Sequence, residues 1–129
     1  MLLTGKTVLV VEPEAFAAYA LERRMHDLDA RDVIVLRDPE EAALRAGGLD
    51  SEEWDGVRVA VIDFDRCERT ASRLAKLLSE RDVKVIGTSS RAPEGVETWR
   101  AQDAIPTVAK PYGMIDIERA IGRHYGVLI

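Results

Sequence analysis

Four short, largely apolar runs, each followed by a polar residue, constrain the fold of this chain more than any other feature. These pairs are residues 8–11 with Glu12, 59–62 with Asp63, 83–88 with Ser89 and 105–109 with Lys110. Near-continuous apolar character is typical of strands covered on both faces, as in a parallel sheet. The carboxyl ends of parallel strands meet at one edge of the sheet. The sequence therefore predicts that these four polar side chains gather at one edge.

The segments between the runs have the pattern of helices. In the first of them, Ala17, Leu21, Met25 and Leu28 fall on one helix face. The predicted strands cover residues 6–11, 32–36, 57–62, 83–88 and 105–109, and the predicted helices cover 14–28, 38–47, 70–81, 91–103 and 114–125. The fourth helix, 91–103, is expected to be short and irregular because it contains Pro93 and Gly95. Five alternating strand–helix pairs predict an α/β fold, a doubly wound (βα)5 sandwich with a five-stranded parallel sheet.

Length and charge exclude several classes of protein. Residues 1–129 have the length of one domain, the net charge is −5 and the pI is near 5.1. Lysine and arginine are scattered, so nucleic-acid binding is not expected. No apolar run approaches the length of a membrane span, and no secretion signal opens the chain, so we expect a cytoplasmic protein without a membrane partner. The single cysteine, Cys67, cannot form an internal disulfide.

The residues expected at the sheet edge are suited to phosphoryl chemistry. A carboxylate, a hydroxyl, a lysine and the extra acids Glu12 and Glu14 are the parts needed to hold a divalent cation and a phosphoryl group. Taken singly, each has a simpler explanation. Lys110 suits a solvated strand end, Ser89 suits a turn, and the two glutamates suit a helix amino terminus. Their joint placement on one edge favours the phosphoryl site.

Four motifs in this order resemble a response-regulator receiver domain over essentially the whole chain. They are VLVVEPE at residues 8–14, VID at 61–63, IGTS at 86–89 and KPY at 110–112. Any one of them is weak evidence, whereas the four together are specific. The segments around Asp63 and Lys110 are most similar to those of stand-alone receivers. The resemblance implies a flavodoxin/CheY-like fold with a partly degenerate acidic site.

The resemblance also implies a role for each edge residue. Asp63 would be the phosphoacceptor, with Mg²⁺ as cofactor, and the donor would be a histidine kinase or phosphotransfer protein. Lys110 would neutralise the phosphoryl charge and Ser89 would bond a phosphoryl oxygen. The expected metal ligands are Glu12, Asp63, Asp65 and Glu14. The output would be binding to a downstream protein of unknown identity, homodimerisation is left open, and the protein would not be an enzyme beyond slow self-dephosphorylation.

Two positions depart from the receiver pattern. Pro13 stands where receivers usually carry an aspartate that ligates Mg²⁺, so metal binding is expected to be weak. Thr107 stands where receivers commonly carry an aromatic residue that reports phosphorylation. Thr88 also lies beside Ser89, and only one of the two can face the crevice because side chains alternate along a strand. The spacing after Val83, the first residue of the predicted strand, favours Ser89 as the residue that faces the crevice. Without the aromatic residue, we expect any switching to appear as ordering of residues 91–103.

Three function classes follow from these residues. The first is a signalling receiver that accepts a phosphoryl group on Asp63. The second is a degenerate receiver that binds partners independently of phosphorylation, because Pro13 and Thr107 depart from the pattern. The third is a phosphatase of the haloacid-dehalogenase type, which Asp63 and Asp65 also resemble. That class ranks last because it requires a later acidic pair at a strand end. The later acids Asp116 and Glu118 fall within the last predicted helix instead.

Overall fold

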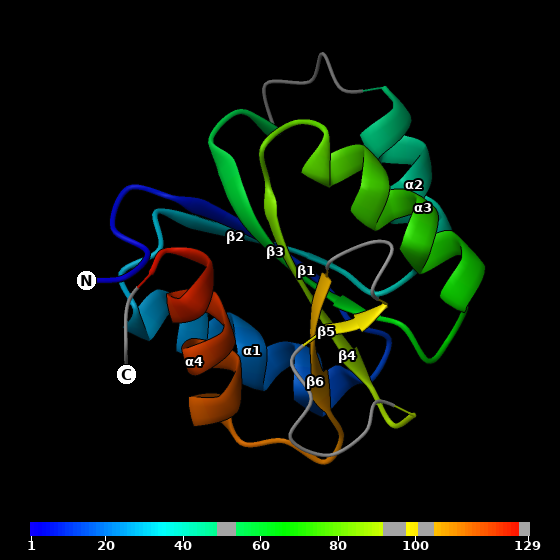
Figure 1. The fold of residues 1–129 in the computed structure, drawn as a ribbon. Helices are drawn as coiled ribbons and strands as arrows, with labels where there is room; N and C mark the ends of the chain where they lie inside the picture. The colour runs from blue at the N-terminus through cyan, green and yellow to red at the C-terminus, as the bar shows by residue number, and fades with distance from the viewer. Residues whose placement is uncertain (49–53, 92–97, 101–104, 127–129) are drawn as a thin grey trace.

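A six-stranded sheet with helices on both faces forms the protein, and the strand order is β2-β1-β3-β4-β6-β5 (Figure 1). The computed structural model describes residues 1–48, 54–91, 98–100 and 105–126. The strands are β1 Thr7–Val11, β2 Asp32–Leu36, β3 Val57–Asp63, β4 Lys84–Ser89, β5 Thr98–Arg100 and β6 Ile105–Ala109. The helices are α1 Ala15–Asp27, α2 Pro39–Gly47, α3 Glu68–Ser79 and α4 Met114–His124. Five strands pair in parallel, which confirms the predicted parallel sheet.

Each face of the sheet carries its own apolar core because the strand side chains alternate. Val8 and Val10 of β1 pack with residues of α1 and α4, whereas Leu9 and Val11 pack with residues of α2 and α3. Figure 1 shows the same division, with α1 and α4 on one side of the sheet and α2 and α3 on the other. Both faces of β1 are therefore buried, which explains its continuous apolar sequence.

The segment predicted as a fourth helix differs from the expectation. Residues 98–100 form the strand β5, which pairs antiparallel with β6. The rest of the predicted helix, residues 92–97 and 101–104, lies outside the described residues. Thr98 and Trp99 are residue types that suit strands. The free edge of β6 offers backbone partners to this short segment, so sheet pairing replaces helical bonding at residues 98–100.

The other predicted elements agree with the structure to within a few residues. Asp38 caps α2 by accepting a hydrogen bond from the Glu40 N–H at 3.0 Å, and Pro39 follows as the first helical residue. Helix α3 begins at Glu68 and ends at Ser79, about two residues earlier than predicted at each end. It is followed by Asp82, whose positive φ of 65° turns the chain into β4.

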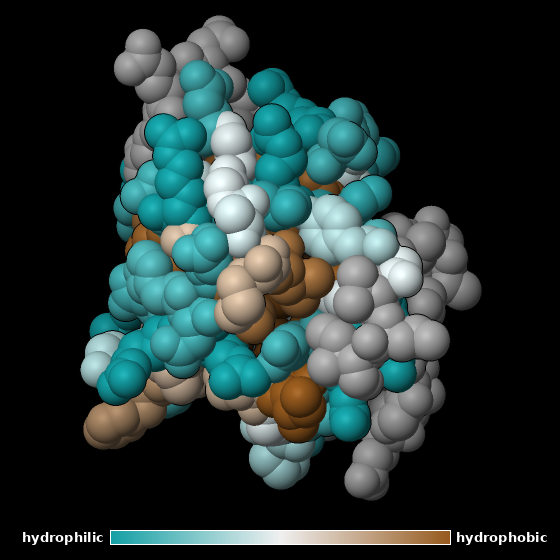
Figure 2. Space-filling model, turned by 90° about the vertical axis from the view of Figure 1, so that its left-hand side faces the viewer, coloured by the Kyte–Doolittle hydropathy of each residue, from teal (hydrophilic) through white to brown (hydrophobic). Residues whose placement is uncertain are grey.

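The surface is largely polar. In the view of Figure 2, hydrophilic residues cover most of the described surface and hydrophobic ones form small patches between them. Among the described residues, the most exposed large apolar side chains are those of Phe16, Leu44 and Met1, which come from different segments. Among the described helices, none is long and apolar enough to span a membrane.

Candidate functional site

The predicted edge residues lie together at the carboxyl ends of the central strands. Strand β1 pairs with β3 so that Val11 lies opposite Ile62, and Glu12 and Asp63 follow directly. Strand β4 pairs with β6 so that Ser89 lies opposite Ala109, the residue before Lys110. Register and strand length therefore bring the four residues to one edge. Glu12, Asp63 and Ser89 are buried there, at 2%, 3% and 0% exposure.

Lys110 is the cation of this edge. Its Nζ forms ion pairs with Asp63 Oδ1 and, at 3.1 Å, with Asp65 Oδ2. Burial alone would lower the pKa of Lys110, but the bonds to the two carboxylates outweigh it and raise the pKa well above its ordinary value. Lys110 therefore carries its positive charge at neutral pH, next to the carboxylates of Asp63 and Asp65.

Asp63 has both carboxylate oxygens engaged. Oδ1 accepts from Lys110, and Oδ2 accepts from the backbone N–H of Arg66 at 3.1 Å. The next residue, Phe64, donates its backbone N–H to Thr88 O at 2.9 Å and so continues the β3–β4 ladder past the site. These bonds fix the direction of the Asp63 carboxylate at the end of β3.

Glu12 and Glu14 have different surroundings although they are close in sequence. Glu12 is buried and accepts from the Glu14 N–H at 2.9 Å. Burial, with a further contribution from the charge of Asp63, raises the pKa of Glu12 above its ordinary value. Glu14 instead caps α1, where its carboxylate accepts from the N–H groups of Ala17 at 2.7 Å and Phe16 at 3.1 Å, and these bonds lower its pKa.

Asp65 lies on the loop after β3 and contacts the end of β4. Its Oδ1 accepts from Ser89 Oγ at 2.9 Å, and the Ser90 N–H lies 3.1 Å from both of its oxygens. Burial opposes the ionisation of Asp65, but the bonds from Lys110, Ser90 and Ser89 outweigh it and lower the pKa. Asp65 therefore stays ionised and links three donors.

The alternative switch hydroxyl, Thr88, is placed differently from Ser89. Thr88 lies opposite Asp63 in the β3–β4 register, and its Oγ1 is buried without a hydrogen-bond partner in the described part of the chain. Ser89 donates to Asp65 and accepts the Arg91 N–H at 3.0 Å. Only Ser89 thus bonds to the residues of the edge, while its role as a switch stays a prediction.

Thr107, at the position of the usual aromatic residue, is buried in β6. Its hydroxyl donates to Ile105 O at 3.2 Å. A side chain added at Gly87 would approach Thr107 Oγ1 at 3.1 Å and the Phe64 ring at 3.0 Å, so Thr107 is closely surrounded. The small Thr107 side chain therefore lies beside Gly87 of the neighbouring strand β4.

The acidic residues at this end of the sheet offer only a few oxygen ligands to a hard cation such as Mg²⁺. Glu12 and Asp63 are carboxylates of the kind that Mg²⁺ prefers, and Mg²⁺ is commonly held by one or two carboxylates, waters and phosphoryl oxygens. Within the described residues, no group of three or more His, Cys, Asp or Glu side chains is arranged to hold a metal. Glu14 caps a helix, and the Pro13 side chain has no ligand atom. The residues therefore fit a Mg²⁺ ion shared with a phosphoryl group and do not form a complete protein cage.

Sequence reasoning missed three contributions to this edge. It gave Asp65 a role only towards metal, and it assigned no role to Tyr112 or Arg37. Arg37 donates from Nε and Nη2 to the Pro13 carbonyl at 3.2 and 2.9 Å, which anchors the loop after β1. Burial, with a further contribution from the charge of Glu12, raises the pKa of Tyr112 to about 12. The position of Tyr112 directly after Lys110-Pro111 was the sequence feature that could have indicated its place near the site.

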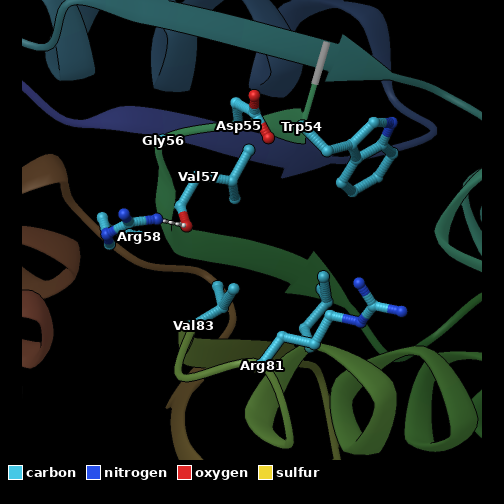
Figure 3. Close-up of a pocket in the computed structure, with 8 residues that line it drawn as sticks. Trp54, Asp55, Gly56, Val57, Arg58, Arg81 and Val83 are labelled. Carbon is cyan, nitrogen blue, oxygen red and sulfur yellow. Dashed lines mark hydrogen bonds between the residues drawn. The ribbon is translucent and has the colours of Figure 1, made fainter. Parts of the chain in front are cut away.

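A cavity of about 340 Å³ lies at the other end of the strands, near their amino termini (Figure 3). It is lined from the amino ends of β3 and β4 by residues that include Trp54, Arg58, Arg81 and Val83. The Arg58 guanidinium donates to Val57 O at 3.0 Å, as the dashed line in Figure 3 marks. This cavity is remote from Asp63, so it is separate from the cluster of ionisable groups at the carboxyl ends of the strands.

Comparison with known proteins supports the fold. No protein-family model and no curated protein matches the chain. Among solved structures, a receiver protein from Burkholderia phymatum is similar with a TM-score of 0.72 and 15% identity, covering 95% of this chain and 96% of that one. The Francisella response regulator 1452 receiver domain gives a TM-score of 0.69, 18% identity and coverage of 93% and 96%.

A third similar structure contains ligands. It is the receiver domain of the histidine kinase CKI1 from Arabidopsis thaliana complexed with Mg²⁺ and BeF₃⁻, with a TM-score of 0.66, 20% identity and coverage of 94% and 92%. At these identities, structural similarity is evidence of fold and does not transfer a site. Together with the parallel sheet, the helices on both faces and the acidic edge, it shows that this chain has the CheY-like fold of response-regulator receiver domains.

Proposed function

We propose that this protein is a two-component receiver that accepts a phosphoryl group on Asp63 and signals by binding another protein. The observation that carries the proposal is the buried Asp63 carboxylate, held by Lys110 at a sheet edge that also contains Glu12 and Ser89. The donor would be a histidine kinase or a phosphotransfer protein. Similarity to receivers in complexes with Mg²⁺ and BeF₃⁻ supports this choice over unrelated functions of the same fold.

The residues of the chain supply orientation and charge for the transfer. An Asp63 oxygen attacks the phosphorus of a phosphohistidine, the new O–P bond forms, the P–N bond breaks and the imidazole keeps the electron pair. The Arg66 N–H and Lys110 hold the carboxylate in one direction before attack. Lys110 then balances the negative charge that the phosphoryl group brings, and Ser89 can donate to one of its oxygens.

Magnesium would be held by Asp63 and Glu12, with Asp65 as the further acidic residue in reach of the edge. When bound, the ion supplies additional positive charge to the phosphoryl oxygens. The lack of a ligand atom in the Pro13 side chain is the reason to expect weak affinity. Since Glu14 is engaged as the cap of α1, we do not propose it as a direct ligand.

The second candidate is a phosphorylation-independent interaction module. Pro13 favours it, because this residue removes a carboxylate that aspartyl phosphorylation ordinarily uses. In that case Lys110 and the acidic residues would serve only to stabilise the edge of the sheet. A phosphatase of the haloacid-dehalogenase type is a third outcome for the same residues, and it would show turnover of a small phosphate ester.

Labelling with acetyl phosphate and Mg²⁺ tests these alternatives. We expect intact-mass spectrometry to detect one phosphoryl group on the wild type and none on Asp63→Asn. Asp27→Asn is the matched control because Asp27 is an exposed carboxylate at the end of α1, at the opposite edge of the sheet. Failure of the wild type to be labelled would favour the interaction module. Repeated hydrolysis of p-nitrophenyl phosphate that is lost in Asp63→Asn would favour the phosphatase.

A further inference from the structure

Asp65 holds three hydrogen-bond donors that differ in kind and come from different segments. These are the Ser89 hydroxyl at 2.9 Å, the Ser90 backbone N–H at 3.1 Å and the Lys110 ammonium at 3.1 Å. A hydroxyl, a backbone N–H and an ammonium group are also the donors that proteins use to bind phosphoryl oxygens. A carboxylate two residues after Asp63 therefore occupies donors that a phosphoryl group on Asp63 would need.

The same contacts fix the path of the chain as it leaves β4. Besides the bonds of Ser89 and Ser90 to Asp65, the Arg91 N–H donates to Ser89 Oγ at 3.0 Å. The Arg91 side chain forms an ion pair with Glu68 of α3 at 3.2 Å. Residues 89–91 are thus tethered to the loop after β3 and to the start of α3 by the protein's own side chains.

We propose that Asp65 is an internal anion that holds the exit of β4 in place and competes with a phosphoryl group on Asp63 for Ser89 and Lys110. Only the second part of this inference, the competition with a phosphoryl group, rests on the proposed receiver function. Phosphorylation would then exchange one anion for another at the same donors. The signal would be the release of Asp65 and the rearrangement of residues 89–91, rather than the first tethering of a free segment.

The first test measures the tether without any phosphoryl ligand. We expect NMR hydrogen exchange of the Ser90 amide to be about tenfold or more faster in Asp65→Ala, because a hydrogen bond to a carboxylate is lost. The Arg91 amide should also exchange faster, since its acceptor Ser89 Oγ loses its own anchor. Asp27→Ala is the matched control and should leave both rates unchanged. Amides in the centre of β1 should keep their protection in every variant, which shows that the fold is intact.

The second test measures competition, using beryllofluoride with Mg²⁺ as the phosphoryl probe. Asp65→Asn removes the competing charge and keeps a side chain of the same size, so we expect it to bind the probe about tenfold more tightly than the wild type. Asp27→Asn should bind like the wild type. Equal or weaker binding by Asp65→Asn would overturn the competition, since Asp65 would then be neutral or helpful to the phosphoryl state.

The two tests separate failure of this inference from failure of the proposed function. Unchanged exchange at Ser90 in Asp65→Ala would overturn the internal tether, whatever the probe does. Absence of probe binding in the wild type and in Asp65→Asn would overturn the receiver function and with it the competition. In that outcome, the exchange result would still decide whether Asp65 holds the exit of β4.

Discussion

Replacing Lys110 by methionine should destabilise the protein more than any other change of a surface-accessible lysine. Lys110 Nζ pairs with Asp63 and Asp65, and Glu12 lies near enough to contribute to its raised pKa. Methionine keeps most of the apolar stem but removes the charge. Three acidic side chains then remain at one edge without their cation, and two of them are almost completely buried.

The magnitude follows from burial of the partners. Removing one member of a buried ion pair costs about 3–5 kcal/mol, because the other charge is left uncompensated. The Lys110 side chain is 26% exposed and Asp63 only 3%, so solvent screens part of the interaction. We therefore expect a loss of about 2–4 kcal/mol in the free energy of unfolding, somewhat below the fully buried case.

Urea unfolding followed by far-ultraviolet circular dichroism measures this loss. The exposed Lys76 of α3 is the matched control, and Lys76→Met should change stability by less than about 0.5 kcal/mol. Adding Asp63→Asn to Lys110→Met should recover much of the loss, because the buried charge is removed with its partner. A loss below about 1 kcal/mol for Lys110→Met, typical of an exposed pair, would refute the reasoning.

Three further changes test the site and its surroundings. Pro13→Asp should raise Mg²⁺ affinity in calorimetry by restoring an oxygen ligand; tight binding already present in the wild type and unchanged in the variant would contradict this. Gly87→Ala should cost about 1–3 kcal/mol in urea unfolding, because the new Cβ meets the Phe64 ring at 3.0 Å in a filled core; unchanged stability would show that the ring moves at no cost. The lowered pKa of Asp65 stabilises the fold above its ordinary value of 3.8 and ceases to do so as the pH falls through the lowered value. In thermal unfolding, the extra stability of the wild type relative to Asp65→Asn should therefore be full above pH 3.8 and be lost as the pH falls through the lowered pKa of Asp65, and a pH-independent difference would contradict the sign.

The sequence by itself was sufficient for the parallel sheet and for the position of the acidic edge. Continuous apolar runs such as residues 8–11 specify strands buried on both faces, and helical spacing such as that of Leu21 and Met25 specifies the layers that cover them. These patterns can be recognised within a short stretch of sequence, because the burial of successive residues follows the period of the helix or strand to which they belong. The edge residues followed from the ends of the strands, since parallel strands end together.

Tertiary structure alone decided which partners the polar side chains take. Glu12 and Glu14 look equivalent in sequence, yet one is buried beside Asp63 and the other caps α1. The sequence indicates only a metal-ligand role for Asp65, and the path of the loop after β3 also brings it to Ser89 and Ser90. The pairing of residues 98–100 with β6 likewise depends on a free strand edge elsewhere in the chain. A hydrogen bond is directional and short in range, so its partner is fixed by register and loop path, which no local pattern of residues specifies.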